Sequence, residues 1–496
     1  MNPPLTPPRR GTFAALMNVC SPPGRGRGVG SWKGKRPNLV LVCGLILHFD
    51  WRMADRIYDA IVIGGGPGGS STASFLARAG KHVLVLEKER FPRFHIGESL
   101  LPYNRRLFAE MGVLETLEKE GFPLKTGAQF HVGNGSKCLK LIFRNGHYTR
   151  EATAFQVERS RFDQLLLRHA QKSGAEVREG FAVTKFDNTT ADFVTVEARD
   201  STGRAHSIRT RFLIDASGRG NFTGNQQGIR VVHPRLRKLA VFGHFNGVRL
   251  DQGEARGDTI IVRLEDKWFW IIPLSPGKVS VGGVMDQAEF AGLKQSPAEV
   301  FNAIVQSSAV MRERMKEARP LNAIQTTGDF SYRNKRFVDR RLIRVGDAAG
   351  FMDPIFSAGI YLAMYSGKLA AQTVSESLAA GDDGTIRLRN YERRVYRAMQ
   401  LYWEMVEGFY TQPFIEVFFE PRNKYNLPSA VTALLAGELE GGWKIKWRMR
   451  LFFWVVRIHA RWHMLPKICF GDLPPNSGTT RLGHSTPNQV MEQTIK

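Results

Sequence analysis

The run Gly64-Gly65-Gly66-Pro67-Gly68-Gly69 constrains the fold of this chain more than any other segment. It follows a short apolar stretch, Ile57–Ile63, and precedes a helical pattern, Ser70–Ala79. The glycines at its first, third and sixth positions serve separate needs: a tight turn, close approach of a pyrophosphate to the backbone, and close packing of helix on strand. The helix N-terminus then offers unpaired N–H groups to phosphates. The pattern predicts an α/β fold with a Rossmann-like dinucleotide-binding domain.

An acidic residue follows at the distance that such a domain requires. A second apolar stretch, His82–Leu86, ends at Glu87, which lies 23 residues after Gly64 and is placed to accept hydrogen bonds from ribose hydroxyls. We therefore expect the dinucleotide to contact residues of the glycine loop and of the end of this stretch: Gly64, Gly66, Pro67, Gly69, Glu87 and Lys88.

Three later segments indicate which dinucleotide binds. Phe212–Gly218 and Leu342–Gly350 each read as a hydrophobic strand that ends in a Gly/Asp turn, and Val157-x-Arg159-x-x-Phe162-Asp163 opens a helix. Singly, each is an ordinary turn before a helix, but in this order they resemble the motifs of FAD-dependent enzymes related to the aromatic hydroxylases. The resemblance implies FAD, with Asp347 on the ribityl chain, and no second glycine motif indicates a bound nicotinamide domain. It implies these cofactor contacts: Arg159, Asp215, Gly346 and Asp347.

Trp268-Phe269-Trp270-Ile271-Ile272-Pro273 places two indoles two positions apart. An alternating apolar run is also typical of an ordinary buried strand. On a strand, Trp268 and Trp270 face the same side, where their rings would separate a flavin from an organic substrate. A role as core tryptophans is compatible with such a wall. The segment resembles the Trp-x-Trp-x-Ile-Pro signature of flavin-dependent halogenases.

Three further segments carry the same resemblance. Gly97-Glu98-Ser99-Leu100-Leu101-Pro102 resembles a segment of halogenases that act on phenols, pyrroles or carrier-bound acyl groups. Lys125-Thr126-Gly127-Ala128-Gln129-Phe130 is similar to the segment that holds the family's essential lysine, and Phe351–Gly359 to its Phe-x-x-Pro-x-x-Ser-x-Gly turn. The chain therefore resembles this type of flavin-dependent halogenase, within the superfamily of FAD-dependent aromatic hydroxylase-like enzymes.

The resemblance implies a reaction and partners. Reduced FAD, dioxygen and chloride or bromide would yield hypohalous acid, with the halide at the Ser357 turn and with Gly359 and Ile360 against the flavin. Backbone N–H groups at such a turn and at the following helix N-terminus suit a weakly basic anion. The implied partners are a separate NAD(P)H-dependent flavin reductase and a small aromatic substrate, free or on an acyl carrier protein.

Lys125 is the candidate for relaying the halogen to the substrate. A neutral amine would form a haloamine, whereas an ammonium group would hydrogen-bond hypohalous acid and polarise it. Complete burial would lower the lysine pKa by as much as about 3–5 units and open the first route at neutral pH. The sequence does not choose between these routes, and a solvated lysine before a strand is the ordinary alternative.

One departure from the family pattern narrows the substrate. Tryptophan halogenases have a glutamate immediately before the serine of the halide turn, and this chain has Phe356 there. The position offers no general base, which argues against free tryptophan. A phenol or a pyrrole is more reactive toward an electrophilic halogen and depends less on a general base.

Length and composition set the domain organisation. At 496 residues the chain exceeds the size at which one core usually divides. We assign residues 53–385 to interleaved FAD-binding and mixed β-sheet substrate domains, and residues 386–474 to a helical C-terminal cap. Residues 1–52, rich in Pro, Gly and Arg, and residues 475–496 are predicted to be disordered. The four cysteines form no Cys-x-x-Cys pair, so they imply neither a metal site nor a disulfide framework, and a cytoplasmic location fits.

A net charge of +24 favours anionic partners. The charges are scattered and no zinc spacing or RNA-binding signature accompanies them, so nucleic acid is not expected. Tryptophans and basic residues alternate through residues 443–462 at roughly helical intervals. We interpret this helix as a cover on the substrate side of the core, with carrier docking and contact with a membrane surface as alternatives.

Three functions compete. The first is a halogenase, which the paired tryptophans and Lys125 favour. The second is an FAD-dependent monooxygenase or a geranylgeranyl-reductase-like oxidoreductase of the same fold, which halide-independent oxygenation or alkene reduction would establish. The third is a flavoprotein that binds its cofactor without catalysis.

Overall fold

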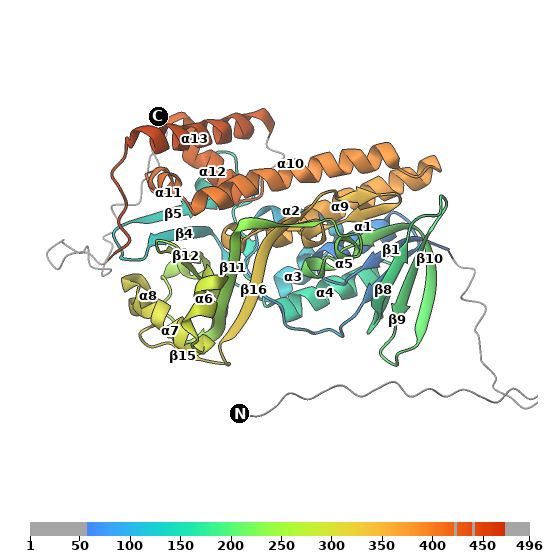
Figure 1. The fold of residues 1–496 in the computed structure, drawn as a ribbon, viewed down its shortest axis with the longest axis horizontal. Coiled ribbons are helices and arrows are strands. Elements are labelled where there is room, and N and C mark those ends of the chain that lie inside the picture. Colours follow the sequence, from blue (N-terminus) through green and yellow to red (C-terminus); the bar gives the residue numbers. More distant parts are fainter. Residues whose placement is uncertain (1–56, 421–423, 439–441, 472–496) are drawn as a thin grey trace, which may run out of the picture. The chain divides into compact units, whose positions relative to one another are not determined.

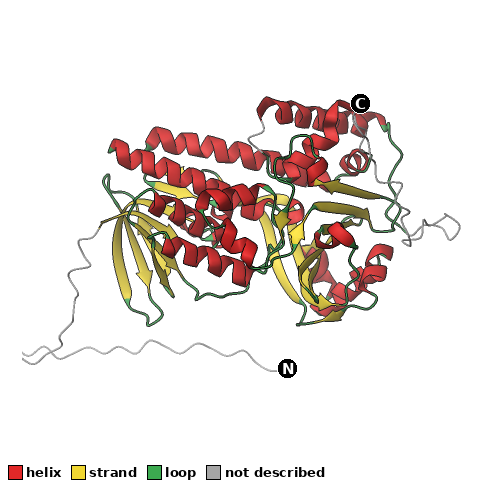
Figure 2. Cartoon of the chain, turned by 180° about the vertical axis from the view of Figure 1, so that it is seen from behind, coloured by secondary structure: helices red, strands yellow, loops and turns green. Residues whose placement is uncertain are grey.

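The computed structural model describes residues 57–420, 424–438 and 442–471 (Figure 1). The two segments predicted to be disordered, 1–52 and 475–496, lie outside these residues. Within the described part, two β-sheets and the helices around them confirm the predicted α/β fold class, including its helical C-terminal region (Figures 1 and 2). The proposed domain boundaries stay a prediction.

The first sheet has eight strands, and its central part is parallel in the order β18-β10-β1-β2-β7. Because the strands are parallel and in register, β1, β10 and β18 end side by side, with Ile63 opposite Asp215 and Asp215 opposite Arg344. The sequence forms this sheet because its central strands are almost continuously apolar, as expected when helices cover them. Its strands are β1 Ile57–Ile63, β2 Val83–Glu87, β7 Glu176–Glu179, β8 Ala182–Asp187, β9 Val194–Arg199, β10 Ala205–Asp215, β17 Val338–Asp339 and β18 Leu342–Arg344.

The second sheet has nine strands in the order β19-β16-β11-β14-β13-β12-β4-β5, with β15 paired to β11. It is antiparallel except between β4 and β12. This is the mixed sheet expected of a substrate domain. Its strands are β4 Gly127–Val132, β5 Cys138–Ile142, β11 Arg230–Asn246, β12 Thr259–Arg263, β13 Trp268–Ser275, β14 Lys278–Asp286, β15 Arg319–Pro320, β16 Gln325–Asn334 and β19 Gly350–Phe351, and a separate pair joins β3 Leu124–Lys125 to β6 Ala154–Phe155.

Side chains of β13 alternate between two cores. Trp268, Trp270 and Ile272 belong to the large core that continues into the first sheet, whereas Phe269 and Ile271 pack with a smaller core that includes Phe301. The prediction that the two tryptophans share one face of a strand is therefore confirmed.

The shorter helices mostly follow the strands that they cover. They are α1 Pro67–Arg78, α2 Tyr103–Met111, α3 Leu114–Lys119, α4 Arg159–Lys172, α5 Phe222–Gln226, α6 Gln287–Leu293, α7 Pro297–Gln306 and α8 Ala309–Met315. A group of helices, three of them long, follows and is drawn in orange to red in Figure 1: α9 Ala358–Ala380, α10 Thr385–Phe409, α11 Gln412–Phe418, α12 Leu427–Leu435 and α13 Gly442–Trp462. None of the helices in the described residues is both long and apolar enough to cross a membrane.

The predicted basic aromatic helix is α13, but it does not bury its tryptophan stripe. Ile445, Met449 and Phe452 are buried, whereas Trp443 and Trp462 are each 71% exposed. The buried residues are spaced four and three apart, which places them on one side of the helix. The helix therefore covers the core through Ile445, Met449 and Phe452 and leaves much of its tryptophan-bearing and basic surface open.

Candidate functional site

A cavity of about 540 Å³ lies at the carboxyl edge of the first sheet, where β1, β2, β10 and β18 end. Residues from β12, β13 and the turn before α9 close its other side. It thus brings together segments that are almost 300 residues apart in sequence. Thirteen of the predicted site residues line it: Gly64, Gly66, Pro67, Glu87, Lys88, Arg159, Trp268, Trp270, Gly346, Asp347, Ser357, Gly359 and Ile360.

The glycine loop has the shape of a pyrophosphate cradle. Gly64 has φ +99°, and a Cβ there would lie 2.5 Å from the Ala216 carbonyl oxygen. A Cβ at Gly69 would lie 1.9 Å from the Gly64 oxygen, so Gly69 does not line the cavity and instead allows α1 to pack on the loop. At Gly66 a Cβ would meet only a guanidinium 3.5 Å away, so this backbone is open. With the N-terminus of α1 following at Pro67, the loop fits the diphosphate of FAD.

Glu87 holds this loop in place as well as lining the cavity. Its Oε2 accepts a hydrogen bond from the Gly65 N–H at 2.6 Å, and its Oε1 accepts one from the Glu89 N–H at 2.9 Å. The neighbouring Lys88 is solvent-exposed and lies 3.7 Å from Glu89. Glu87 therefore couples the glycine loop to the end of β2, in the position expected for a ribose ligand.

Of the remaining predicted FAD ligands, one lies behind the cavity and two lie in its wall. Asp215 does not line the cavity, and its carboxylate accepts hydrogen bonds from the backbone N–H groups of Ser217 and Thr223 at 3.0 and 2.7 Å. Arg159 donates to both carboxylate oxygens of Asp163 at 2.8 Å. Asp347 lies deep in the cavity, and burial raises its pKa to about 6. Asp215 thus shapes the loop after β10, while Arg159 and Asp347 lie within reach of a ligand.

The sequence interpretation missed four charged residues that line the cavity, the first of them Glu89, directly after Lys88. The Arg93 guanidinium lies beside Gly66, and its Nη1 is 3.2 Å from an oxygen of the buried Asp163. Glu98 forms a buried pair with Nε2 of His244 on β11 at 3.1 Å. Arg219 is the fourth of these charged residues. A basic residue just after the second strand was the available signal for Arg93, whereas the pairing of Glu98 depends on a strand 146 residues away.

Trp268 and Trp270 both line this cavity and form part of its wall. Trp268 is 1% exposed, and its ring centroid lies 5.9 Å from that of Trp270. The Trp270 Nε1–H donates to the Ser280 hydroxyl at 3.1 Å, and the ring lies over Gly282, where a Cβ would be 2.2 Å away. The Trp268 Nε1–H donates to the Tyr410 hydroxyl at 2.9 Å. Each indole is therefore fixed in orientation by a hydrogen bond.

The predicted halide turn adjoins this wall. Pro354–Phe356 form a short 3₁₀ turn, Ser357 adopts the left-handed conformation with φ +57°, and α9 begins at Ala358. Ser357 and Gly359 line the same cavity as the tryptophans. The N-terminus of a 23-residue helix thus reaches the cavity, and its first N–H groups have no intrahelical acceptor. This arrangement suits a small anion.

Lys125 lies one layer behind the cavity wall. The side chain is 2% exposed, and its Nζ donates to the Ser99 hydroxyl at 2.9 Å and to the Leu100 carbonyl at 3.2 Å. Ser99 and Thr259 line the cavity, and their hydroxyls are 2.7 Å apart. The alternative of a solvated lysine is therefore wrong.

Burial lowers the pKa of Lys125 to about 7, and the Asp258 carboxylate opposes that shift. Both protonation states of the amine are then populated at neutral pH. Ser99 joins the amine to the cavity, a role that the sequence interpretation did not assign to it.

A second cavity, of about 280 Å³ and lined mainly by apolar side chains, lies among α11, α12, α13 and β5. A chain of ring contacts leads to it from the halide turn. Phe356 contacts Phe130 with ring centroids 6.3 Å apart, and Phe130 contacts Phe418, which lines this cavity, at 4.9 Å. Phe356 is thus part of an aromatic cluster and offers no base.

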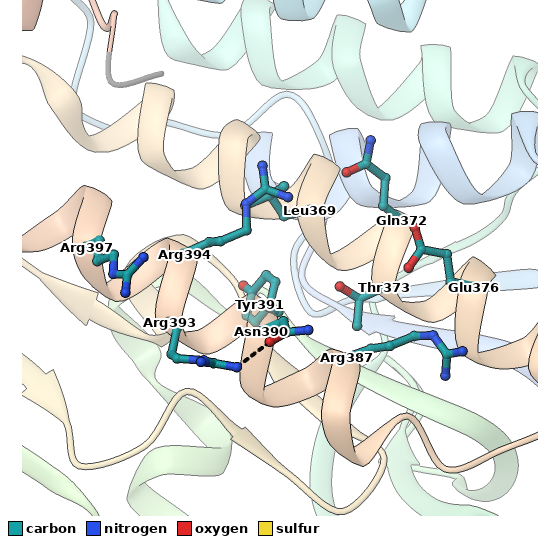
Figure 3. A pocket seen from close by; sticks show the side chains of 10 residues that line it. All are labelled: Leu369, Gln372, Thr373, Glu376, Arg387, Asn390, Tyr391, Arg393, Arg394 and Arg397. Atoms are coloured by element: carbon teal, nitrogen blue, oxygen red, sulfur yellow. Dashed lines mark hydrogen bonds between the residues drawn. The ribbon is translucent and has the colours of Figure 1, made fainter. Parts of the chain in front are cut away.

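A third hollow, of about 410 Å³, lies between α9 and α10 (Figure 3). None of the predicted site residues lines it. Figure 3 shows the guanidinium groups of Arg387, Arg393 and Arg397 spread along α10 without converging on one point. We therefore regard this hollow as a basic surface groove separate from the flavin cavity.

Comparisons with known proteins identify the family of the chain. Residues 57–403 match the family model of an FAD binding domain. The chain is 31% identical over 398 residues to the 1H-pyrrole-2-carbonyl-[peptidyl-carrier protein] brominase of Pseudoalteromonas luteoviolacea, covering 78% of this chain and 94% of that protein. It is 33% identical to the tryptophan 2-halogenase of Chondromyces crocatus over 356 residues, 71% of this chain and 67% of that protein. The solved structure of the myxobacterial chondrochloren halogenase CndH superposes with a TM-score of 0.68 at 30% identity, covering 81% of this chain and 97% of that one.

Proposed function

The chain belongs to the flavin-dependent halogenases, and from that premise we propose that it halogenates an electron-rich aromatic ring, a pyrrole or a phenol, that a carrier protein presents. The observation that carries this proposal is one continuous arrangement: the flavin cavity, its tryptophan wall, and the buried Lys125 joined to the cavity by Ser99. FAD is the cofactor, and the halide is chloride or bromide.

When bound, reduced FAD supplies hypohalous acid from dioxygen and the halide. The protein's residues do the rest. N–H groups at the start of α9 bind the halide, and Trp268 and Trp270 keep the organic substrate away from the flavin. The hydroxyls of Ser99 and Thr259 offer hydrogen bonds along the way to Lys125. Because hypohalous acid is indiscriminate in water, a buried path of this kind is needed for selective transfer.

Lys125 then holds the halogen or polarises its bond to oxygen. A neutral amine is competent to form a haloamine, and an ammonium group to donate a hydrogen bond to hypohalous acid. With a pKa of about 7, the two routes predict opposite pH dependence. Transfer through the amine rises as pH increases through 7, whereas transfer through the ammonium group falls.

Two features support a carrier-bound pyrrole or a phenol as the substrate. The brominase relative acts on a carrier-bound pyrrole, and it matches this chain over nearly its full length. Phe356 stands where tryptophan halogenases have glutamate, which leaves the ring without a base at that point. Free tryptophan is the second candidate, because the tryptophan 2-halogenase is also a relative.

The exposed face of α13 supplies a docking surface for an acidic carrier. Lys446, Arg450 and Arg457 are exposed along one side of this helix, together with the 52% exposed Trp454. No acidic residue occurs within Gly442–Trp462. Trp454 also lines the 280 Å³ apolar cavity, so the basic face adjoins a space for an apolar group. Opposite charge on a carrier helix would steer the two proteins together.

Two further elements of the proposal concern the cell. A separate NAD(P)H-dependent reductase supplies reduced FAD, since the chain has one glycine motif of the dinucleotide-binding type. The enzyme works in the cytoplasm, where the cysteines stay reduced.

The test supplies purified enzyme with reduced FAD, dioxygen and bromide, and detects brominated products by mass spectrometry. The substrates are a pyrrole-2-carbonyl group on a carrier protein, the same acyl group on a short pantetheine mimic, simple phenols and free tryptophan. Bromination of the carrier-bound pyrrole or of a phenol supports the activity, and bromination of tryptophan alone contradicts the substrate assignment. Oxygenated product without bromide would instead establish a monooxygenase.

A charge reversal on α13 tests the docking surface. Arg450→Glu with Arg457→Glu should raise the KM for the carrier-bound substrate about 10-fold and leave the pantetheine mimic unaffected. Arg393→Glu with Arg397→Glu, in the groove of Figure 3, makes the same charge change elsewhere. An equal or larger effect of this control pair would remove α13 from the proposal.

A further inference from the structure

Tyr410 connects two parts of the site that the tryptophan motif and the halide turn describe separately. It follows α10 directly, and its hydroxyl accepts a hydrogen bond from the Trp268 indole at 2.9 Å. The same hydroxyl donates to Oδ2 of Asp353 at 2.7 Å. The two partners lie 142 and 57 residues from Tyr410 in sequence, so only the folded chain brings them together.

Asp353 stands at the start of the halide turn and holds its backbone. Its Oδ1 accepts from the Ile355 N–H at 3.3 Å, and its own N–H donates to the Ser331 hydroxyl at 3.1 Å. The Ser357 N–H closes the turn on the Pro354 carbonyl at 2.8 Å. The carboxylate therefore fixes the turn on one side and binds Tyr410 on the other.

The hydrogen-bonded groups lie largely out of solvent, beside two cationic side chains. Asp353 is 4% exposed, and the Lys238 Nζ lies 4.4 Å from the centroid of the Tyr410 ring. The Arg263 guanidinium lies 5.6 Å from the same ring. A buried polar group without a partner is costly, so each of these groups favours the observed geometry.

We propose that Tyr410 is a positioning residue, whose hydroxyl holds the Trp268 indole and the Asp353 turn in one fixed arrangement so that the wall and the halide turn close the flavin cavity together. The inference rests on the proposed function for its catalytic consequence, but its structural claim is independent of it. Tyr410 does not line the flavin cavity, so it acts through its two partners.

Loss of the hydroxyl therefore has a definite consequence. A phenylalanine at position 410 keeps the ring but leaves the indole N–H and the carboxylate without their shared partner. The indole is then free to rotate, and water gains access between the wall and the turn. We expect less halogenated product for each flavin oxidised, with the difference released as hydrogen peroxide, and weaker halide binding.

The structural claim is tested first, on the FAD-loaded protein labelled with ¹⁵N at the indole nitrogens. The chain has nine tryptophans, and Trp268→Phe identifies the signal of Trp268. Tyr410→Phe should shift this signal and accelerate its hydrogen exchange. Tyr402→Phe is the matched control, because Tyr402 is a buried tyrosine on the neighbouring α10 and its hydroxyl donates to the Leu434 carbonyl at 2.8 Å. An unmoved Trp268 signal in Tyr410→Phe overturns the proposal, whatever the enzyme's activity.

The catalytic consequence is tested with bromide and with whichever substrate of the panel described above the wild-type enzyme brominates. Tyr410→Phe should lower product per flavin oxidised about 3- to 10-fold and raise the KM for bromide, while Tyr402→Phe leaves both unchanged. The double variant Trp268→Phe/Tyr410→Phe should be no worse than the poorer single variant, because both remove the same interaction. Fully additive losses, or equal losses in Tyr402→Phe, contradict a positioning role. If wild-type enzyme makes no halogenated product, the proposed function fails while the spectroscopic test still decides the network.

Discussion

The flavin cradle and the region behind the tryptophan wall are built in opposite ways. In the cradle, backbone groups form the binding surface: Gly64 and Gly66 open the loop, and the N-terminus of α1 faces the cavity. Behind the wall, hydrogen bonds between polar side chains fix the structure: Lys125 donates to Ser99, and Tyr410 donates to Asp353. A backbone cradle tolerates no added atoms, whereas a buried polar network tolerates no missing partner. The two regions should therefore fail differently when mutated.

The largest effect is expected at Lys125. Replacing it with alanine should lower the rate of halogenation about 100-fold or more, because the proposed function assigns the positioning of the halogen to this amine. Oxidation of reduced flavin should continue. The measurement is product formation against flavin oxidation in single turnovers. Lys140→Met, on the partly exposed β5, is the control. A variant at position 125 that halogenates at the wild-type rate would remove this lysine from the mechanism.

A smaller, purely steric effect is expected in the cradle. Gly64→Ala should weaken FAD binding about 10-fold or more, since the added Cβ meets the Ala216 carbonyl oxygen and the backbone keeps φ +99°. Titration of the apoprotein with FAD measures it. Gly80→Ala carries a similar strain at φ +72° with no neighbouring atom within 4 Å. It should cost stability without changing FAD affinity, and equal losses of affinity would argue against a specific clash at the loop.

Stability should respond to Lys125 in the opposite direction from activity. The pKa of this lysine is about 7 in the folded protein, against 10.5 for an ordinary lysine, so the native state binds fewer protons than the unfolded state between these values. Wild-type stability therefore falls as pH decreases from about 10 to 7. Lys125→Met lacks this loss of stability. Its melting temperature should therefore rise relative to that of wild type as pH decreases from about 10 to 7. A pH-independent difference would show that the amine is not desolvated.

A second pH-dependent effect on stability concerns Asp353, which Tyr410, Trp268 and Lys238 face. Burial raises its pKa to about 6, against 3.8 ordinarily, so the native state binds more protons between these values and stability falls as pH rises through them. Asp353→Asn lacks this fall. As pH rises from 4 to 6, the free energy of unfolding of this variant should increase relative to that of wild type by at most about 3 kcal/mol. Denaturant unfolding at several pH values measures the difference. Burial also raises the pKa of Asp347 to about 6. This residue is present in both proteins, so its contribution to the pH dependence cancels in the difference between them.

The cradle was predictable because its parts are local. Gly64, Gly69 and Glu87 lie within 24 residues, and each has a steric or hydrogen-bonding reason that holds in any protein of this pattern. The shared face of Trp268 and Trp270 followed from strand geometry alone. Asp215 shows the limit of such inference, because a motif places it beside the cavity without deciding whether its carboxylate binds a ligand or its own loop.

The C-terminal helix shows the same limit. Its periodicity predicted a helix with an aromatic, basic stripe, and α13 is that helix. The face that packs on the core is the one that carries Ile445, Met449 and Phe452, and the exposed tryptophans Trp443 and Trp462 lie outside it. Which face is buried depends on the shape of the core surface against which the helix packs. Other segments of the chain form that surface, so the sequence of the helix does not determine it.

By itself, the sequence determined the dinucleotide fold, the cofactor, and the family whose lysine, tryptophans and halide turn it shares. Its motifs are short, and each needs only backbone geometry and near neighbours to take shape. The tertiary structure alone decided that Lys125 is buried and reaches the cavity through Ser99, and that Tyr410 joins Trp268 to Asp353. The pKa of an amine and the orientation of an indole depend on groups brought from distant parts of the chain, and only folding creates that environment.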